Sequence, residues 1–319
     1  MHLVLKPFHG KIYQKNGIFS SYDKNIFYGI DKYLKKRGLN IVTADVTTPR
    51  EADYYIFCDV PYPWEVKYWI LLLKHLKKSI LVCFESPIIN PFSHLRFIQK
   101  LFKQVYSWED SQNLPTNVIK FYIPQTNRDM NISPVKFTDK QFLVMINSFK
   151  SSHPFLNFLS RYKTDLYQER LRAIGFFESN LNNEFSLYGK GWPSGTYSSY
   201  RGYVKNKIRT LRMFKYSLCF ENNPAPGYIS EKIFDCFKAK CVPIYLGAPN
   251  IRDYIPESCF IDLRNFSNYQ ELLAFLKSIS EANYERYLRS ADKFLSNPKT
   301  IQTWFDPGFI SKITKLKQI

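Results

Sequence analysis

The sequence predicts an α/β protein built from two doubly wound, Rossmann-like domains with a cleft between them. The chain has 319 residues, which is long for a single hydrophobic core. Apolar runs of strand length alternate with amphipathic runs of helix length, which is typical of parallel sheets covered by helices. A polar, proline-edged stretch at 124–139 interrupts this alternation and indicates a linker between the domains.

The first domain is expected over residues 1–130. Its predicted strands are nearly continuous apolar runs, as expected for a sheet that is buried on both faces. These strands are 3–6, 41–46, 54–60, 79–85 and 104–107. The predicted helices are 25–37, 65–76 and 92–102.

The second domain is expected over residues 140–300 and repeats the same alternation. Its predicted strands are 142–146, 185–188, 216–220, 242–245 and 259–262. Its predicted helices are 166–178, 205–213, 231–238, 269–279 and 283–295. The remaining segment, 301–319, is expected to contain a helix near 309–316 that packs back on the first domain.

The chain is strongly basic, with 45 Lys and Arg against 27 Asp and Glu and a net charge of +18. Such a surplus favours an anionic partner, either a nucleotide-sugar diphosphate, an anionic membrane or a nucleic acid. No nucleic-acid-binding motif is visible, so we expect no nucleic-acid partner. The segments 65–78 and 309–319 are basic and partly amphipathic, so each can lie on a membrane or simply pack on its own domain.

The cysteines and the N-terminal segment favour a cytoplasmic location, with peripheral contact to the inner membrane face as an open possibility. Most of the six cysteines lie in apolar runs, and none has the C-x-x-C spacing of a zinc or redox site. Reduced thiols are the simplest interpretation. The segment MHLVLKPFHG lacks the layout of a signal peptide, and no apolar run is long enough to span a bilayer.

The segment 215–235 carries the most chemical information. A buried strand ends at Phe220, Glu221 and Asn222 follow, and Ser230 is a plausible N-cap for the next helix. The start of a helix offers free N–H groups and a positive dipole, which suit a diphosphate, and Lys232 adds a full charge there. The alternative is that Glu231 is an ordinary first-turn acid and Lys232 its solvated neighbour.

The run FENNPAPGYISEKIFDCFKAKCVPIYLGAPNIRDYIPESCFID at 220–262 resembles the donor-binding segment of the α-1,3/4-fucosyltransferases, glycosyltransferase family 10. The runs LYQER at 166–170, FSLYGKGW at 185–192 and YRGYVKNK at 200–207 resemble bacterial members of the same family. The resemblance covers most of 140–300 and is thin before it, apart from FESP at 84–87.

The resemblance implies a GT-B architecture with the acceptor side first and the donor side second. It implies inverting transfer of L-fucose from GDP-fucose to a glycan hydroxyl, and contacts to the GDP-sugar from Asn222, Tyr228, Glu231 and Lys232. It implies that Arg170 is a second cation on the diphosphate, the alternative being an arginine on a helix surface.

The same resemblance assigns Glu85 the role of general base. A carboxylate at a strand end that faces the cleft can take the proton of the attacking hydroxyl. The alternative is that Glu85 is a capping acid in a loop. The chain departs from the family pattern at Asn223, Gly227 and Ser230.

No Asp-x-Asp motif is present to hold a divalent ion, so we expect catalysis with no essential cofactor or metal. Three alternatives remain open: a transferase of the same fold with another nucleotide sugar, a non-catalytic carbohydrate-binding module, and a nucleic-acid-binding protein. The acceptor is expected to be a bacterial surface glycan such as lipopolysaccharide O-antigen, free or lipid-linked, joined through an α-1,3 or α-1,4 linkage.

Overall fold

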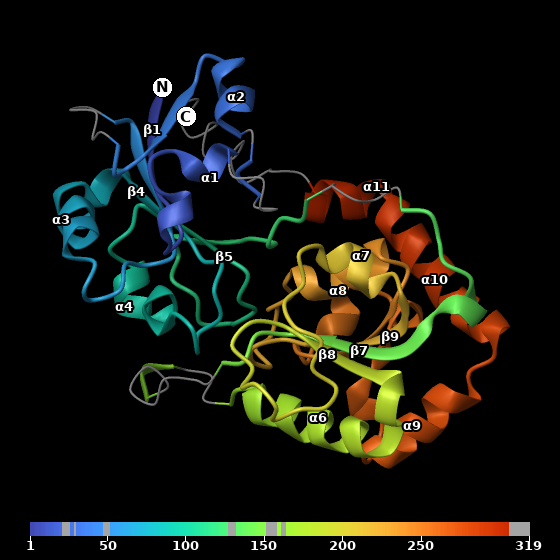
Figure 1. Ribbon diagram of the computed structural model, residues 1–319. Coiled ribbons are helices and arrows are strands. Elements are labelled where there is room, and N and C mark those ends of the chain that lie inside the picture. Colours follow the sequence, from blue (N-terminus) through green and yellow to red (C-terminus); the bar gives the residue numbers. More distant parts are fainter. Residues whose placement is uncertain are drawn as a thin grey trace. The chain divides into compact units, whose positions relative to one another are not determined.

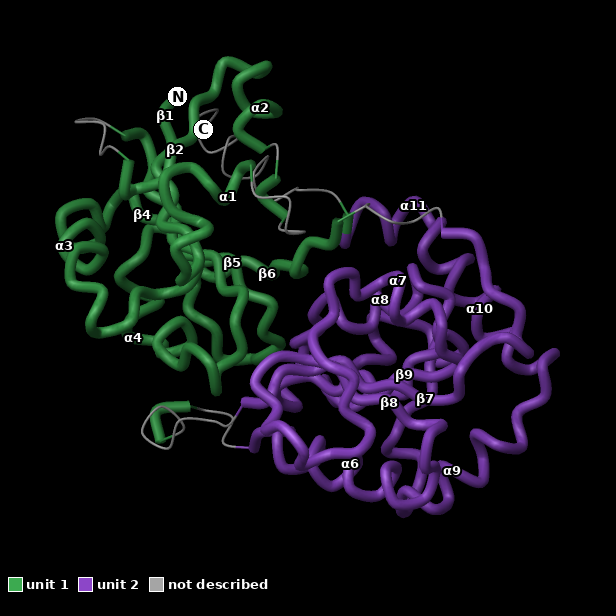
Figure 2. Tube along the Cα trace, in the orientation of Figure 1, with its two compact units in different colours: residues 1–128, 153–163, 305–319 green, residues 129–152, 164–304 purple. Residues whose placement is uncertain are grey.

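The computed structural model describes residues 1–20, 26–28, 30–46, 52–126, 132–150, 158–160 and 164–305. The chain divides into two compact units (Figure 2). Unit 1 holds residues 1–128, 153–163 and 305–319, and unit 2 holds 129–152 and 164–304. The predicted linker lies partly outside the described residues, and the predicted helix at 309–316 lies wholly outside them.

Unit 1 is built on a six-stranded sheet in the order β2-β1-β3-β4-β5-β6, and every pair of neighbours is parallel (Figure 1). The strands are β1 (His2–Lys6), β2 (Asn40–Thr43), β3 (Tyr54–Cys58), β4 (Ser79–Val82), β5 (Gln104–Ser107) and β6 (Val118–Lys120). Strands β3 and β4 are buried at every position, which explains their uninterrupted apolar sequences.

Helices cover both faces of this sheet. Helices α1 (Gly17–Ser20) and α2 (Ile30–Lys35) pack on one face, and α3 (Val66–Lys74) and α4 (Arg96–Gln99) pack on the other. Short 3-10 turns complete the unit at Lys11–Tyr13, Leu76–Lys78 and Pro91–His94.

Unit 2 is built on a five-stranded parallel sheet in the order β11-β10-β9-β7-β8. The strands are β7 (Gln141–Ile146), β8 (Phe185–Tyr188), β9 (Phe214–Phe220), β10 (Val242–Leu246) and β11 (Ile261–Asp262). The chain leaves β7 toward one edge of the sheet and leaves β9 toward the other. Right-handed crossovers therefore place the following helices on opposite faces.

The main helices of unit 2 are α6 (Tyr167–Leu181), α7 (Lys207–Leu211), α8 (Glu231–Lys238), α9 (Tyr269–Ser278), α10 (Glu281–Ser296) and α11 (Pro298–Thr300). Helices α6, α9 and α10 share one hydrophobic core with the sheet. Short 3-10 or π turns lie at Phe137–Asp139, Asn182–Glu184, Ile251–Asp253, Glu257–Cys259, Leu263–Asn265 and Ile301–Phe305.

The predicted fold class is confirmed, because both units are doubly wound parallel sheets. Several predicted bounds are wrong. The strands predicted at 41–46, 54–60 and 79–85 end at Thr43, Cys58 and Val82. Strand β3 stops early because Asp59 adopts a left-handed conformation with φ of 59°.

Two further predictions in unit 1 need correction. The helix predicted at 92–102 is broken, because Leu95 is extended and separates a 3-10 turn from the four-residue α4. The three-residue strand β6 was not predicted, because its short sequence carries no alternation. In unit 2, the strand predicted at 259–262 is limited to Ile261–Asp262, since a 3-10 turn occupies Glu257–Cys259.

Each sheet has one point at which its strand order reverses. In unit 1 this point lies between β1 and β3, and in unit 2 it lies between β7 and β9. Doubly wound sheets bind ligands at the carboxyl ends of the strands beside such a point. The residues that follow β7 and β9 in unit 2, and β1, β3 and β4 in unit 1, are therefore the places to look for a site.

Candidate functional site

Arg170 lies at the reversal point of unit 2. It stands in the first turn of α6 and is only 4 % exposed. Its Nη2 donates to the carbonyl oxygens of Phe220 (3.0 Å) and Glu221 (2.7 Å) and to Oδ1 of Asn222 (3.1 Å). Arg170 and Asn222, two predicted site residues, are thus brought together, and the alternative of a surface arginine is wrong.

Arg170 remains a cation in this place. Burial lowers its pKa, although a guanidinium stays protonated at neutral pH. The carbonyl groups at the end of β9 accept from Nη2 of the Arg170 guanidinium. Its Nε has no hydrogen-bond partner among the described residues. A buried positive charge with spare donors suits an anionic ligand.

Glu221 connects the end of β9 to the start of α8. Its side chain is fully buried and accepts from the N–H of Ser230 (2.8 Å), from Ser230 Oγ (2.7 Å) and from Lys232 Nζ (3.0 Å). The sequence placed Glu221 at the end of a strand but predicted no role for it. One feature of the sequence could have indicated its ion pair with Lys232: an acid directly after a buried strand, with a lysine eleven residues further on.

Helix α8 begins as predicted. Ser230 is its N-cap and accepts from the N–H of Lys232, although this bond is long at 3.4 Å. Lys232 is 15 % exposed and donates to Glu221 and to Ser230 Oγ, so the alternative of a solvated neighbour is wrong. Burial acts to lower the pKa of Lys232, but the charges of Glu221 and Glu231 together outweigh it and raise the pKa.

The other two predicted donor contacts lie in the same segment. Tyr228 is buried at 3 % exposure, just before the N-cap. Glu231 is 58 % exposed in the first turn of α8 and lies 3.9 Å from Lys207 Nζ. Its position fits an ordinary first-turn acid and also leaves its carboxylate accessible to a ligand.

Gly227 departs from the family pattern for a conformational reason. Its φ is 81°, a left-handed conformation that side chains rarely adopt. Its N–H donates to Oδ1 of Asn250 at 2.9 Å, which ties the loop after β9 to the loop after β10. Asn223, the other departure, is fully buried, and both polar atoms of its amide lack hydrogen-bond partners among the described residues.

Gly247, which follows β10, packs against this site. A Cβ atom there would lie 2.5 Å from Glu221 Cγ and 2.4 Å from the Tyr245 hydroxyl oxygen. We expect Gly247→Ala to lower the free energy of unfolding by about 1–3 kcal/mol and to weaken anion binding, because Glu221 has to move. The measurement is urea unfolding with and without nucleotide.

The control for this variant is Gly175→Ala in the middle of α6. A Cβ at Gly175 meets nothing within 4 Å, so this change is expected to stabilise the helix by roughly 0.5–1 kcal/mol. If Gly247→Ala is as stable as the wild type, the close packing of Gly247 on Glu221 does not constrain the site.

Glu85 lies in unit 1, after β4, and its backbone is held on both sides. Its N–H donates to the carboxylate of Asp59 (3.2 Å), and its carbonyl oxygen lies 3.0 Å from Nε2 of His94. Asp59 is buried, and burial raises its pKa. Asp59 was not predicted, because Cys58-Asp59-Val60 resembles the continuation of a strand.

A second buried acid, Glu109, supports His94. Its carboxylate lies 3.7 Å from His94 Nδ1 and accepts from two nitrogens of Arg96, at 2.6 and 3.0 Å. Burial acts to raise the pKa of Glu109, but the contacts with His94 and the hydrogen bonds and charge of Arg96 together outweigh it and lower the pKa from 4.5 to about 2. The turn that carries Glu85 is therefore anchored by a buried charged network.

This network predicts a specific pH dependence of stability. The pKa of Glu109 is lower in the folded protein than in the unfolded chain, so the unfolded chain takes up the proton first as the pH falls. The stabilisation is present above about pH 4.5 and is lost toward pH 2, and it amounts to about 3 kcal/mol at most. We expect Glu109→Gln to lose less stability than the wild type on acidification, measured by urea unfolding at neutral and acidic pH. Equal losses in the two proteins would contradict the assignment.

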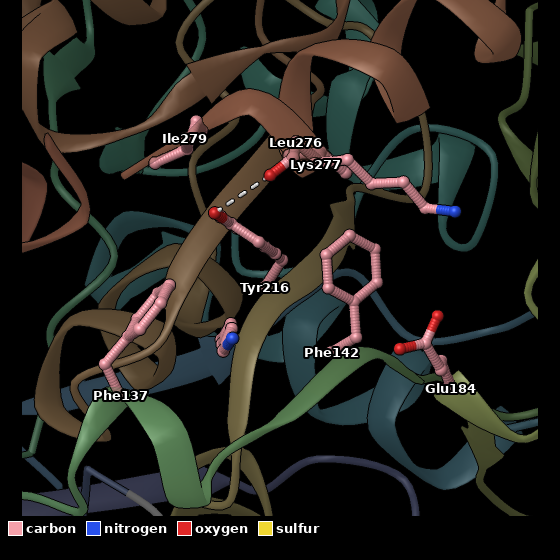
Figure 3. Close-up of a pocket in the computed structure, with 8 residues that line it drawn as sticks. Phe137, Phe142, Glu184, Tyr216, Leu276, Lys277 and Ile279 are labelled. Atoms are coloured by element: carbon pink, nitrogen blue, oxygen red, sulfur yellow. Dashed lines mark hydrogen bonds between the residues drawn. The ribbon is translucent and has the colours of Figure 1, made fainter. Parts of the chain in front are cut away.

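A pocket of about 360 Å³ lies at the opposite edge of the sheet in unit 2 (Figure 3). It is lined by Phe137, Phe142, Glu184, Lys215, Tyr216, Leu276, Lys277 and Ile279. These residues surround the amino ends of β7, β8 and β9, and the Tyr216 hydroxyl donates to the carbonyl of Leu276 at 3.4 Å. Since the strands are parallel, this pocket is separate from the site at their carboxyl ends.

The described residues contain no group of His, Cys, Asp and Glu side chains arranged to hold a metal ion. Two cationic side chains, Arg170 and Lys232, lie at the carboxyl end of β9 and at the start of α8. This arrangement can bind a diphosphate and stabilise the charge that grows on it as a leaving group.

A comparison with protein families shows which family contains this arrangement of residues. The model described as "Glycosyltransferase family 10 (fucosyltransferase) C-term" matches residues 147–309, about half of the chain and most of unit 2. The chain belongs to glycosyltransferase family 10. The match contains Arg170, Asn222, Tyr228, Glu231 and Lys232, while Glu85 lies outside it.

Individual relatives in family 10 align over shorter stretches. An α-(1,3)-fucosyltransferase of Helicobacter pylori is 40% identical over 75 residues, 23% of this chain and 16% of that protein. A human 4-galactosyl-N-acetylglucosaminide 3-α-L-fucosyltransferase is 32% identical over 117 residues, 36% of this chain and 31% of that protein. The aligned part is thus less than a third of the length of either relative.

Solved structures confirm the fold over the whole chain. A crystal structure of an α1,3-fucosyltransferase has a TM-score of 0.65 at 16% identity and covers 100% of this chain and 90% of that one. Another, with GDP-fucose, has a TM-score of 0.56 at 16% identity and covers 90% and 81%. An α-glucosyltransferase in complex with UDP and DNA has a TM-score of 0.58 at 11% identity and covers 99% and 100%. The fold class is therefore GT-B, with two Rossmann-like domains.

Proposed function

We propose that this family 10 protein transfers L-fucose from GDP-fucose to a hydroxyl group of a glycan. The observation that carries the proposal is the meeting of Arg170, Asn222 and the start of α8 at the reversal point of unit 2, within the segment that the family model matches. Two fixed cations at the positive end of a helix dipole suit the diphosphate of a nucleotide sugar.

In the proposed mechanism the acceptor hydroxyl attacks the sugar carbon that carries the diphosphate, in one inverting displacement. The bond from that carbon to GDP breaks, and GDP leaves with the electron pair. Arg170 and Lys232 stabilise the growing negative charge, and Glu85 takes the proton of the hydroxyl. Unit 1 supplies Glu85 on a turn that Asp59 and His94 hold.

The identity of the acceptor and the cellular location of the protein are also part of the proposal. The names of the relatives favour position 3 of the acceptor sugar, and the α-1,4 linkage is the alternative that product analysis decides. We propose a bacterial surface glycan as the acceptor and the cytoplasm as the location, on the support of six free, buried cysteines.

The donor is tested by calorimetric titration of the full chain with GDP-fucose, GDP-mannose, UDP-galactose and GDP. The expected result is micromolar binding of GDP-fucose and GDP and weaker binding of UDP-galactose. If only a uridine nucleotide binds, the alternative of a same-fold transferase with another donor holds, and binding without any turnover favours a non-catalytic carbohydrate-binding module. If no nucleotide binds, the proposal fails.

We further propose that transfer needs no divalent metal, because Arg170 and Lys232 supply the positive charge at the diphosphate. The expected outcome is that activity in excess EDTA equals activity in added Mn²⁺ or Mg²⁺, measured as GDP release. A loss of activity in EDTA that Mn²⁺ restores would overturn this expectation.

A further inference from the structure

One face of unit 1 carries an apolar stripe that no described residue covers. On α3, Val66, Ile70 and Leu73 are 60 %, 48 % and 60 % exposed. The spacing of four and three residues places them on one side of the helix. The buried residues of α3, Tyr68, Leu71 and Leu72, lie on the other side against the core, so α3 is apolar on both sides.

The stripe continues onto neighbouring elements. Trp64, just before α3, is 64 % exposed and stacks on the Tyr62 ring at 4.8 Å. Phe97 on α4 is 67 % exposed, and Leu101 after it is 39 % exposed. Helices α3 and α4 pack on the same hydrophobic cluster, on the same face of the sheet. We call Trp64, Val66, Ile70, Leu73, Phe97 and Leu101 the α3–α4 face.

The charge around the α3–α4 face is mainly positive. Residues 64–104 contain six lysines and one arginine against two acids, Glu65 and Glu85, and the Glu65 side chain is only 11 % exposed. All six lysines are exposed, and Lys67, Lys74, Lys77 and Lys100 form no ion pair with an acid among the described residues. Lys67 and Lys74 share the side of α3 next to the stripe.

We propose that the α3–α4 face docks on an anionic lipid surface. Apolar side chains at this density bordered by lysines match an interface with apolar chains below and negative headgroups around them. An exposed tryptophan at the edge of the stripe is the side chain that such interfaces favour. The segment 306–319 does not complement this face, because it carries Lys312, Lys315 and Lys317 against a single acid.

The lipid surface explains the face better than the other partners that a basic surface can have. A nucleic acid would bind the lysines through its phosphates and would leave the aliphatic side chains without a contact. A second copy of the chain would bring lysines against lysines at the border of the stripe. In the described residues no helix is long and apolar enough to cross a bilayer, so the proposal concerns the surface of the membrane only.

The test is flotation of the full chain with vesicles of phosphatidylcholine alone, or of two parts phosphatidylcholine and one part phosphatidylglycerol. The wild type is expected to bind the anionic vesicles at least about tenfold more tightly than the neutral ones. The Ile70→Gln, Leu73→Gln double variant is expected to lose about tenfold in affinity through its smaller apolar area. The Lys67→Gln, Lys74→Gln double variant, which removes two charges, is expected to bind anionic vesicles about tenfold or more weakly. Its vesicle binding is also expected to depend less on salt.

Matched controls lie in unit 2. The Lys277→Gln, Lys293→Gln variant has the same net charge as the lysine variant, and Met213→Gln, Ile301→Gln removes two apolar side chains that are 41 % and 44 % exposed. Both are expected to bind anionic vesicles as the wild type does. Wild-type affinity in either α3 variant, or no binding of the wild type to anionic vesicles, would overturn the proposal.

Sedimentation velocity without lipid tests whether the α3–α4 face binds a second copy of the chain instead of a lipid surface. A wild-type dimer that Ile70→Gln, Leu73→Gln dissociates would assign the face to a second copy and overturn the lipid proposal. The α3 variants are expected to keep full GDP-fucose affinity and full transfer to a soluble acceptor. The lipid proposal therefore stands or falls independently of the proposed reaction.

Discussion

Replacing Glu85 by glutamine is expected to lower kcat for glycosyl transfer by about 10²–10⁴-fold, because the amide cannot take the proton of the acceptor hydroxyl. The change keeps the size of the side chain. It also keeps the backbone N–H that donates to Asp59 and the carbonyl oxygen next to His94. GDP-fucose affinity, measured by calorimetry, is expected to stay unchanged, so the loss is confined to the chemical step.

The control is Asp53→Asn, a carboxylate of unit 1 at the amino end of β3 that accepts from the N–H of His2 at 2.7 Å. This change is expected to leave kcat at the wild-type value. If Glu85→Gln retains more than a tenth of the wild-type kcat, Glu85 is not the base. The capping interpretation would then hold.

Lys232→Ala is expected to weaken GDP-fucose binding by at least about tenfold, which corresponds to roughly 1.4 kcal/mol. The variant loses the charge at the start of α8 and leaves the buried Glu221 carboxylate without its cation. For the second reason the free energy of unfolding is also expected to fall, by about 3 kcal/mol. Calorimetry reports the first effect, and urea unfolding reports the second.

A double variant separates the two effects. Glu221→Gln combined with Lys232→Gln removes both charges, so most of the lost stability is expected to return while donor affinity stays low. Lys240→Ala, which breaks an ion pair with Asp292 near the other end of α8, is the control and is expected to bind GDP-fucose normally. If the double variant also recovers donor affinity, Lys232 acts only as a structural partner of Glu221.

The elements that the sequence predicts best are those with the strongest local pattern. Strands β5 and β8 and helix α8 are found at the predicted bounds, because short apolar runs and a good N-cap define them within a few residues. The ends of β3 and β4 were placed too late. Whether an apolar run continues past Cys58 depends on the conformation of Asp59, which tertiary hydrogen bonds to the turn after β4 stabilise.

The candidate site divides in a similar way. Ser230 and Lys232 were predicted from the local sequence, and Arg170, Asn222 and Tyr228 came from the family resemblance. The buried partners Glu221, Asp59 and Glu109 were not predicted. Their roles depend on contacts between segments that are far apart in the chain, such as the hydrogen bond between Asp59 and Glu85, which are 26 positions apart. No local pattern encodes such a contact.

The burial of Glu221 has a consequence for attempts to change the sugar-nucleotide preference of this protein. Its carboxylate holds Ser230 and Lys232, its carbonyl oxygen holds Arg170, and its N–H donates to the carbonyl of Leu246. A library that randomises this position would consist mostly of misassembled sites. Diversity is better introduced at Glu231, whose side chain is 58 % exposed. Directed evolution can explore this position while the frame of the site stays intact.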